Sequence, residues 1–279
     1  MKIAVDQIWN PFTPDHIDFL FNFEYTLVQN INVADVIFQA LENYPVKRTK
    51  EKQFLIKISG EPNNTIDNHY DLNLGNNEDS EKTLYCPYFM FNLYSKQNSP
   101  LRINLLLERP ISIMSEKTKF CLFINSNPTK ERIDFVNELQ KYKHVDCLGK
   151  VLNNGEKLTH HFGSSEFLEF INQYKFMVCF ENSNISGYGS EKPINAYAGG
   201  SIPIYWGSQE IYNLINKNAF IINEDITKTI EEIKYLDNDD QAYFNKWSQP
   251  FFLNNIIPEK LQLKQLQDKI YSRIKKKID

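Results

Sequence analysis

The second half of this 279-residue chain alternates short, wholly apolar runs with stretches of helical periodicity. The apolar runs lie at residues 120–124, 176–180, 202–206 and 219–222. A continuous apolar run suits a strand that is covered on both faces, as in a parallel sheet. After the first run, Phe135, Leu139 and Tyr142 recur at helical spacing, which predicts one buried stripe. Strands that alternate with helices indicate an α/β fold whose ligands bind at the carboxyl ends of the strands.

Turn and capping residues mark the ends of these elements. Asn127 and Pro128 follow the first apolar run, so we expect Asn127 to cap a helix whose first position is Pro128. Ser190 is expected to cap a second helix over residues 191–198, with Pro193 just inside its first turn.

The first hundred residues show the same pattern more weakly, with apolar runs at residues 3–5, 36–38 and 54–58. A long asparagine-rich polar stretch follows over residues 62–80. The chain length suits two packed domains of roughly 110 to 150 residues each. We therefore expect one domain over residues 1–109, a linker through Lys119 and a second domain over residues 120–257.

Residues 258–279 are expected to form a C-terminal amphipathic helix. Its apolar face carries Leu263, Leu266, Ile270, Ile274 and Ile278, and three lysines occupy residues 275–277. Packing back across a domain and docking to an anionic membrane surface would use these same residues, so both interpretations stay open.

Composition excludes several classes of protein. The 31 basic and 35 acidic side chains leave a net charge of −4, which does not suit a nucleic-acid binder. The N-terminus reads as a strand rather than a secretion signal, and no apolar run approaches the length of a membrane span. The four cysteines are scattered, without a CxxC pair. We expect a cytoplasmic protein in a reduced state, with peripheral contact at the inner membrane surface as the open alternative.

We expect the ligand-binding residues to lie in the glycine-rich part of the chain, after the apolar run at residues 176–180. Eight of the ten glycines lie between Gly149 and Gly207, and glycine permits the tight turns that a bound ligand requires. Backbone N–H groups at the start of the helix over residues 191–198, together with Lys192, would favour a phosphate. The Glu191 carboxylate suits the cis-diol of a ribose. Together they indicate a nucleotide, although Glu191 and Lys192 alone also fit a solvated first turn.

The order of residues in this segment resembles a known family. The string Phe-Glu-Asn-Ser begins at Phe180, Tyr188 stands three residues before Glu191-Lys192, and residues 202–208 read Ile-Pro-Ile-Tyr-Trp-Gly-Ser. This pattern is similar to the signature of the family 10 glycosyltransferases, the α-1,3/4-fucosyltransferases, and especially of their bacterial branch. The resemblance is strong over residues 176–208, moderate over residues 120–154 and faint in the first domain.

The resemblance implies a GT-B-type fold of two facing Rossmann-like domains with a cleft between them. It implies an inverting transferase that moves L-fucose from GDP-β-L-fucose to a hydroxyl of a GlcNAc-containing or similar acceptor, an oligosaccharide or glycolipid, giving an α-1,3 or α-1,4 fucoside. The sequence does not choose between Lewis-type and lipopolysaccharide acceptors. The alternatives are transfer from another nucleotide sugar, or a non-catalytic module that binds a glycan or a nucleotide.

The resemblance also implies roles for individual residues. Asn182 and Tyr188 would line the nucleotide and sugar-phosphate cavity, Glu191 would meet the ribose, and Lys192 the diphosphate. Arg132, in the helix after Pro128, would balance the charge of the leaving group through its forked guanidinium. On the residues alone, Arg132 also fits an exposed helix position.

The general base is expected in the first domain. In the family, a Gly-Glu pair at the end of a strand is the proposed base, and Gly60-Glu61 stands in the corresponding place after residues 54–58. Glu61 is therefore the candidate, although Asp67, Asp71 and Glu78 are close enough in the sequence to compete.

No obligatory cofactor is expected. Residues 237–240 (Asp-Asn-Asp-Asp) are similar to a DxD metal motif, but they follow a helical pattern over residues 226–236 rather than a buried strand. A polar connection between two helices is the favoured interpretation. His160 and His161 are adjacent and have no further ligand at metal-binding spacing. A divalent cation would act at most as a stimulant that screens the diphosphate.

Overall fold

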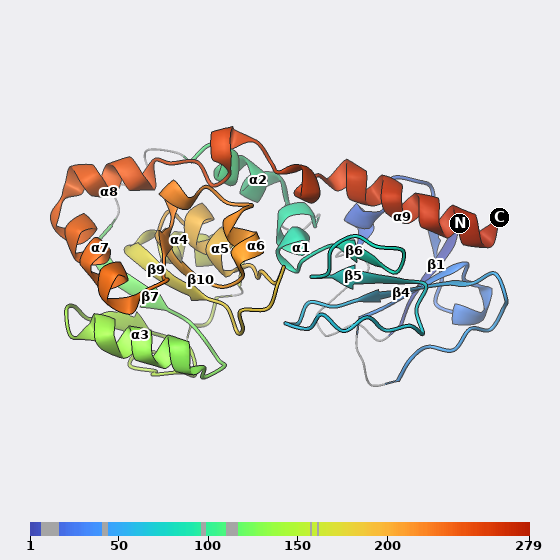
Figure 1. The fold of residues 1–279 in the computed structure, drawn as a ribbon, viewed down its shortest axis with the longest axis horizontal. Coiled ribbons are helices and arrows are strands. Elements are labelled where there is room, and N and C mark those ends of the chain that lie inside the picture. The colour runs from blue at the N-terminus through green and yellow to red at the C-terminus, as the bar shows by residue number, and fades with distance from the viewer. Residues whose placement is uncertain (7–16, 41–43, 96–98, 110–116, 157, 161) are drawn as a thin grey trace. The chain divides into compact units, whose positions relative to one another are not determined.

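The computed structural model describes residues 1–6, 17–40, 44–95, 99–109, 117–156, 158–160 and 162–279 (Figure 1). The expected α/β class is confirmed, because the strands form two sheets in which every pairing is parallel. The expected linker lies largely outside the described residues, at residues 110–116.

The chain forms two compact units. The first comprises Met1–Pro100, Ile185–Gly189 and Ile257–Asp279, and the second comprises Leu101–Asn184 and Ser190–Ile256. The domain ranges 1–109, 120–257 and 258–279 stay a prediction.

The first unit is built on a six-stranded sheet in the order β2-β1-β3-β4-β5-β6. Its strands are β1 (Lys2–Asp6), β2 (Thr26–Leu27), β3 (Val36–Gln39), β4 (Phe54–Ile58), β5 (Leu72–Gly75) and β6 (Thr83–Tyr85), followed by helix α1 (Phe89–Tyr94). The apolar runs at the start of this unit predicted β1, β3 and β4. The pattern missed β5, which lies inside the asparagine-rich stretch. Its buried Asn73 interrupts the apolar run and uses its side-chain amide to bond the Asp67 and Lys82 carbonyls.

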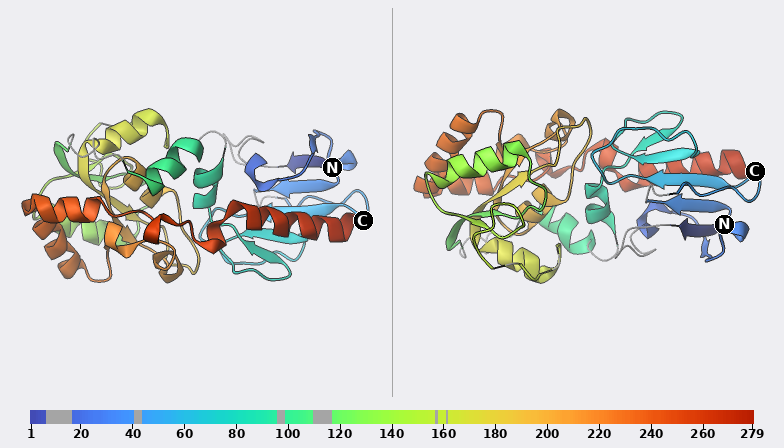
Figure 2. Two further views of the ribbon diagram at one scale, coloured as in Figure 1. Left: turned by 90° about the horizontal axis from the view of Figure 1, so that it is seen from above. Right: turned by 90° about the horizontal axis from the view of Figure 1, so that it is seen from below.

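Helix α9 (Leu263–Ile278) packs against this first sheet, as the ribbon shows from two sides (Figures 1 and 2). Leu266, Ile270 and Ile274 are buried, so most of the predicted apolar face is covered within the unit. The helix starts five residues later than the predicted range, because Glu259–Leu261 forms a 3₁₀ turn after Pro258. Over the described part of the chain, no helix is both long and apolar enough to span a membrane.

The second unit is built on a five-stranded sheet in the order β11-β10-β9-β7-β8. Its strands are β7 (Lys119–Phe123), β8 (Val145–Cys147), β9 (Tyr174–Phe180), β10 (Ile202–Trp206) and β11 (Ile221–Ile222). The helices that accompany them are α2 (Ser99–Leu107), α3 (Lys130–Gln140), α4 (Ser165–Asn172), α5 (Lys192–Ala198), α6 (Gln209–Tyr212), α7 (Ile226–Asn238) and α8 (Asp240–Trp247).

The central strand β9 shows why these runs are wholly apolar. Phe176, Val178 and Phe180 share one core with α3, α7 and α8. The intervening Cys179 points to the other face, where its thiol lies 3.5 Å from the Lys192 carbonyl of α5. Because both faces of β9 are covered, apolar and polar residues do not alternate along this strand, and its sequence is continuously apolar.

Three further predicted boundaries are wrong. Helix α5 begins at Lys192 rather than at residue 191, and Glu191 rather than Ser190 is the residue before it. Helix α3 begins at Lys130 rather than at Pro128, because the backbone is still extended at Thr129 and the Asn127 carbonyl accepts a hydrogen bond from Arg132. The last strand covers only Ile221–Ile222, since residues Lys217–Ala219 form a 3₁₀ turn that Asn216 caps.

Candidate functional site

The residues that follow β9 lie at the middle of the second sheet's carboxyl edge, because β10 and β7 flank this strand on either side. In a parallel sheet this edge is where ligands bind. Three of the predicted donor residues, Asn182, Glu191 and Lys192, follow β9 in the second unit, and Arg132 reaches the end of β9 from α3.

Arg132 is completely buried, so the interpretation as an exposed helix residue is wrong. Its Nη2 donates to the Phe180 carbonyl at 2.6 Å and to the Asn182 Oδ1 at 2.7 Å, and its Nη1 donates to the Asn127 carbonyl at 2.9 Å. The guanidinium therefore joins the loop before α3 to the end of β9 and orients the Asn182 amide. A single forked cation makes these contacts in directions that an ammonium cannot match.

Glu181 is a buried carboxylate that the sequence analysis did not assign to any role. Its Oε1 accepts from the Ser190 N–H at 2.8 Å and from the Tyr205 hydroxyl at 3.3 Å, and its Oε2 accepts from the Ser190 hydroxyl at 2.6 Å. The Lys192 ammonium lies 3.6 Å from Oε2. The signal in the sequence was a lone acidic residue directly after an apolar strand, which also fits a loop carboxylate.

The start of α5 differs from the expected anion-binding helix terminus. Glu181 occupies the Ser190 N–H, the Ser190 hydroxyl accepts the Lys192 N–H at 3.4 Å, and Pro193 has no N–H. The helix is also only seven residues long. A phosphate at this corner would therefore be held mainly by the Lys192 ammonium, whose side chain is 17% exposed.

The remaining donor candidates lie close by in the sequence. Glu191 is half-buried at the residue before α5. Tyr188 is 3% exposed in the segment Ile185–Gly189, which groups with the first unit. There Gly187 adopts a φ of +75°, and a Cβ at this position would lie 2.1 Å from the Asn76 carbonyl oxygen, so the tight turn requires glycine.

Glu61 lies in the first unit, where it follows Ser59 and Gly60 after the end of β4, and it is exposed. The competing carboxylates are engaged: Asp67 pairs with Lys57 at 3.3 Å, Asp71 with Arg48 at 2.6 Å, and Glu78 with Lys260 at 2.6 Å. Across the described residues, no ion pair to Glu61 is found. Glu61 therefore differs from its three competitors, each of which is held in an ion pair.

Three buried polar atoms at or near the carboxyl edge of the second sheet lack a hydrogen-bond partner within the described structure. They are Asn125 Nδ2 after β7, Thr129 Oγ1 before α3 and Asn223 Oδ1 after β11. Buried polar groups are normally satisfied, so these atoms are candidates for contact with a bound molecule. The sequence analysis did not find them, because an asparagine after a strand also reads as a simple turn.

The DxD-like segment connects α7 and α8, as predicted. Asp237 pairs with Lys143 at 2.8 Å and Lys175 at 3.2 Å, while the Asp239 side chain accepts from the Ala242 N–H and caps α8. Burial alone would raise the pKa of Asp237, but hydrogen bonds from Lys143 and Tyr142 outweigh it and lower the pKa. Among the described residues, no group of three or more metal-binding side chains was found.

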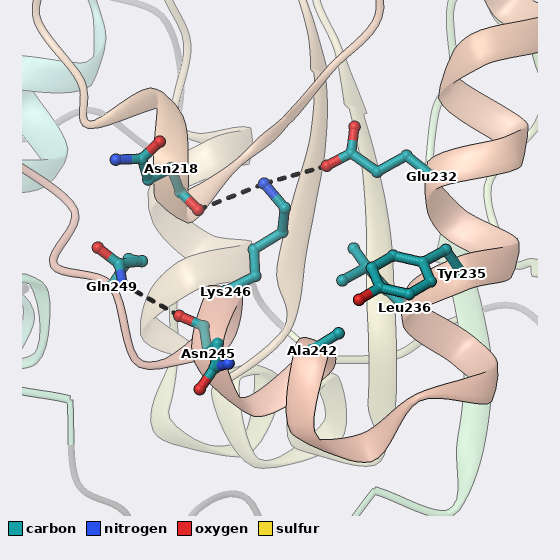
Figure 3. Close-up of a pocket in the computed structure, with 8 residues that line it drawn as sticks. All are labelled: Asn218, Glu232, Tyr235, Leu236, Ala242, Asn245, Lys246 and Gln249. Carbon is teal, nitrogen blue, oxygen red and sulfur yellow. Dashed lines mark hydrogen bonds and ion pairs between the residues drawn. The ribbon is translucent and has the colours of Figure 1, made fainter.

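A pocket of about 470 Å³ lies beside α7 and α8 (Figure 3). None of the predicted site residues lines it, and its polar groups bond largely within the unit. Lys246 donates to the Asn218 and Phe220 carbonyls and pairs with Glu232 at 3.1 Å, and the Gln249 amide donates to the Asn245 carbonyl. The pocket is separate from the candidate donor residues.

Comparison with known families identifies the class of protein. The profile described as glycosyltransferase family 10 (fucosyltransferase), C-terminal part, matches residues 114–275. This match covers more than half of the chain and includes Arg132, Asn182, Glu191 and Lys192. The chain belongs to glycosyltransferase family 10, and the resemblance seen in the sequence is confirmed.

Individual relatives agree with this assignment. A putative fucosyltransferase of Acanthamoeba polyphaga mimivirus is 31% identical over 72% of this chain and 34% of its own length. An α-(1,3)-fucosyltransferase of Helicobacter pylori is 36% identical over 46% of this chain and 27% of its own length. The matched segments therefore span about a third or less of these curated relatives.

Solved structures establish the type of fold. A crystal structure of an α1,3-fucosyltransferase matches 98% of this chain and 90% of its own chain with a TM-score of 0.70 at 24% identity. A DNA-modifying β-glucosyltransferase matches 99% of this chain and 100% of its own with a TM-score of 0.63 at 11% identity. The expected GT-B-type fold is thereby confirmed.

Proposed function

We propose that this protein transfers L-fucose from GDP-β-L-fucose to a hydroxyl of a GlcNAc-containing or similar glycan, with inversion, to give an α-1,3 or α-1,4 fucoside. The observation that carries the proposal is the cluster at the end of β9. There, within the family-matched segment, a buried Arg132 orients Asn182, and the partly exposed Lys192 side chain places its ammonium beside Ser190.

The proposed reaction is a single displacement. The acceptor oxygen forms a bond to C1 of fucose while the bond from C1 to the β-phosphate oxygen breaks, and both bonding electrons leave with GDP. Glu61 takes the acceptor proton as general base. Lys192 balances the charge that develops on the diphosphate, Glu191 binds the ribose, and Tyr188 and Asn182 line the nucleotide and sugar-phosphate cavity. The resemblance implies that Arg132 balances the charge of the leaving group directly. Because its guanidinium is buried and donates to Asn182 Oδ1, we propose instead that it acts through the Asn182 amide that it orients.

Donor identity is supported by the relatives. Curated relatives include GDP-fucose protein O-fucosyltransferase 3 of Homo sapiens, 32% identical over 42% of this chain, and a structural relative was crystallised with GDP-fucose. Because one of these relatives is named a protein O-fucosyltransferase, a hydroxyl group of a protein is a second candidate class of acceptor. Transfer of another nucleotide sugar, and binding without transfer, remain the alternative functions.

The test is incubation of the purified protein with GDP-fucose, GDP-mannose or UDP-glucose and an array of β-galactosides, GlcNAc-terminated oligosaccharides and a folded protein acceptor. Product mass identifies the donor, and linkage analysis identifies the bond. The proposal predicts product with GDP-fucose alone, on a glycan. Product with another donor, product on the protein acceptor alone, or nucleotide binding without any product would contradict it.

We further propose that no metal is obligatory. The support is that the DxD-like Asp237 is held by two lysines and Asp239 caps a helix. Turnover should survive EDTA, with added divalent cations acting only as a stimulant; loss of turnover that a metal restores would refute this.

For location we propose the cytoplasm, supported by four buried, unpaired cysteines that suit a reducing compartment. A peripheral contact with anionic lipid through the basic end of α9 is part of this proposal, supported by Lys275, Lys276 and Lys277.

A further inference from the structure

Glu181 is fully buried, yet it keeps a carboxylate that the proposed reaction does not use. Removing a carboxylate from water is costly unless hydrogen bonds and a cation compensate for it. Here three donors converge on its two oxygens, two of them from Ser190 and one from Tyr205. The contacts tie the end of β9 to the residue two positions before α5.

The same carboxylate faces Lys192. The ammonium lies 3.6 Å from Glu181 Oε2 and donates to Ser190 Oγ at 3.1 Å. An ammonium has three donors, so at least one remains for a ligand on its exposed side. Lysine is a flexible point charge, and anchoring it from within reduces the conformational freedom that it would lose on binding an anion.

The neighbouring backbone makes room for this arrangement. A Cβ on Gly207 would lie 2.9 Å from Glu181 Cγ and 2.6 Å from the Tyr205 hydroxyl. Gly207 directly follows β10, the strand paired with β9. The ends of both strands therefore fit around the carboxylate.

We propose that Glu181 is a positioning residue of the donor site, which holds Ser190 and Lys192 so that the Lys192 ammonium meets the diphosphate of the nucleotide. This inference rests on the proposed function, because it assumes that the chain binds GDP-fucose. Glu181 touches neither the sugar nor the nucleotide, and it acts through Lys192.

The first test is calorimetric titration of Glu181→Gln with GDP and with guanosine, which lacks phosphates and needs no contact with Lys192. GDP affinity should fall about tenfold or more, while guanosine affinity changes less than about twofold. The matched control is Ser201→Ala, which removes another fully buried group that bonds the Ile171 and Tyr174 carbonyls beyond the other end of α5. It should leave the ratio of the two affinities unchanged.

A double-mutant cycle separates positioning from a general loss of structure. In the Lys192→Ala background, Glu181→Gln should weaken GDP binding no further, because the group that it positions is gone. Equal losses for GDP and guanosine, additive effects with Lys192→Ala, or tighter GDP binding by Glu181→Gln would each overturn the proposal. If Glu181→Gln does not fold, Ser190→Ala serves instead, since its hydroxyl lies between the two charges and its loss should weaken GDP binding severalfold.

A measurement without nucleotide keeps this inference distinct from the proposed function. If the wild-type protein binds no GDP, the proposed function fails. The rate of acylation of Lys192 by an amine-reactive reagent, followed by peptide mass, then tests the anchoring itself. Glu181→Gln should raise that rate at least about threefold, the effect of losing one net hydrogen bond's worth of anchoring, and Ser201→Ala should not. An unchanged rate would overturn the anchoring of Lys192.

Discussion

At the scale of single residues, Arg132 is a buried cation whose forked guanidinium donates to three separate oxygens. Replacing it by lysine should leave at least one of the Phe180, Asn182 and Asn127 oxygens without its donor. We expect Arg132→Lys to lower the free energy of unfolding by about 3 kcal/mol and to weaken GDP binding. Denaturant titration measures the loss of stability, and Lys130→Ala, at an exposed position of the same helix, is the control. An unchanged unfolding midpoint for Arg132→Lys would show that the forked contacts of Arg132 do not stabilise the fold.

Glu61 gives the second prediction at this scale. Glu61→Gln should preserve GDP affinity and lower turnover by about 10² to 10⁴, the usual contribution of a positioned base. Steady-state kinetics and calorimetry measure the two quantities. Asp67→Asn is the control, because Asp67 already pairs with Lys57. Near-wild-type turnover of Glu61→Gln would exclude it as the base.

Some residues of the candidate site could be predicted from the sequence, and others could not. The family pattern pointed to Arg132, Asn182, Glu191 and Lys192, and the structure joins Arg132 to Asn182. It could not reveal Glu181 as the partner of Lys192, because that pairing depends on how β9 and the segment before α5 meet in space.

At the scale of elements, α9 is the clearest case of a helix stabilised by packing. Ile270 is completely buried, whereas Ile278 on the same stripe is half-buried. We expect Ile270→Ala to cost about 2 to 5 kcal/mol of stability, because it removes buried methyl groups and leaves a cavity. Ile278→Ala should cost clearly less. Equal, small effects in thermal or denaturant unfolding would show that α9 is not docked in solution.

The membrane proposal is tested on the same helix. With its apolar stripe covered, contact with lipid would depend on the lysines at its end, and such contact is weakened by salt. Sedimentation with anionic vesicles should bring down the wild-type protein at low salt but not a variant with Lys275, Lys276 and Lys277 changed to glutamine. Equal sedimentation of both proteins, or none of either, would refute a lysine-dependent contact.

At the scale of the whole molecule, the second unit was more readable from sequence than the first. Strands covered on both faces leave continuous apolar runs, so β7, β9 and β10 were visible. In the first unit, β2 has only two residues and β5 carries the buried Asn73, so neither gives a pattern. The sequence also could not tell which core α9 covers, because an amphipathic stripe fits any apolar surface; it packs in the unit that contains the N-terminus.

The proposed function assigns the diphosphate of a guanosine nucleotide to the segment joining β9 to α5. Calorimetric titration of GDP into the wild-type protein and Lys192→Ala tests it directly. The matched control is Lys246→Ala, because its side chain is also 17% exposed and pairs with a glutamate at 3.1 Å, outside the donor residues. We predict that the wild type and Lys246→Ala bind GDP alike, and that Lys192→Ala binds at least about tenfold more weakly. Equal GDP affinity in all three proteins would exclude this segment as the site of the diphosphate.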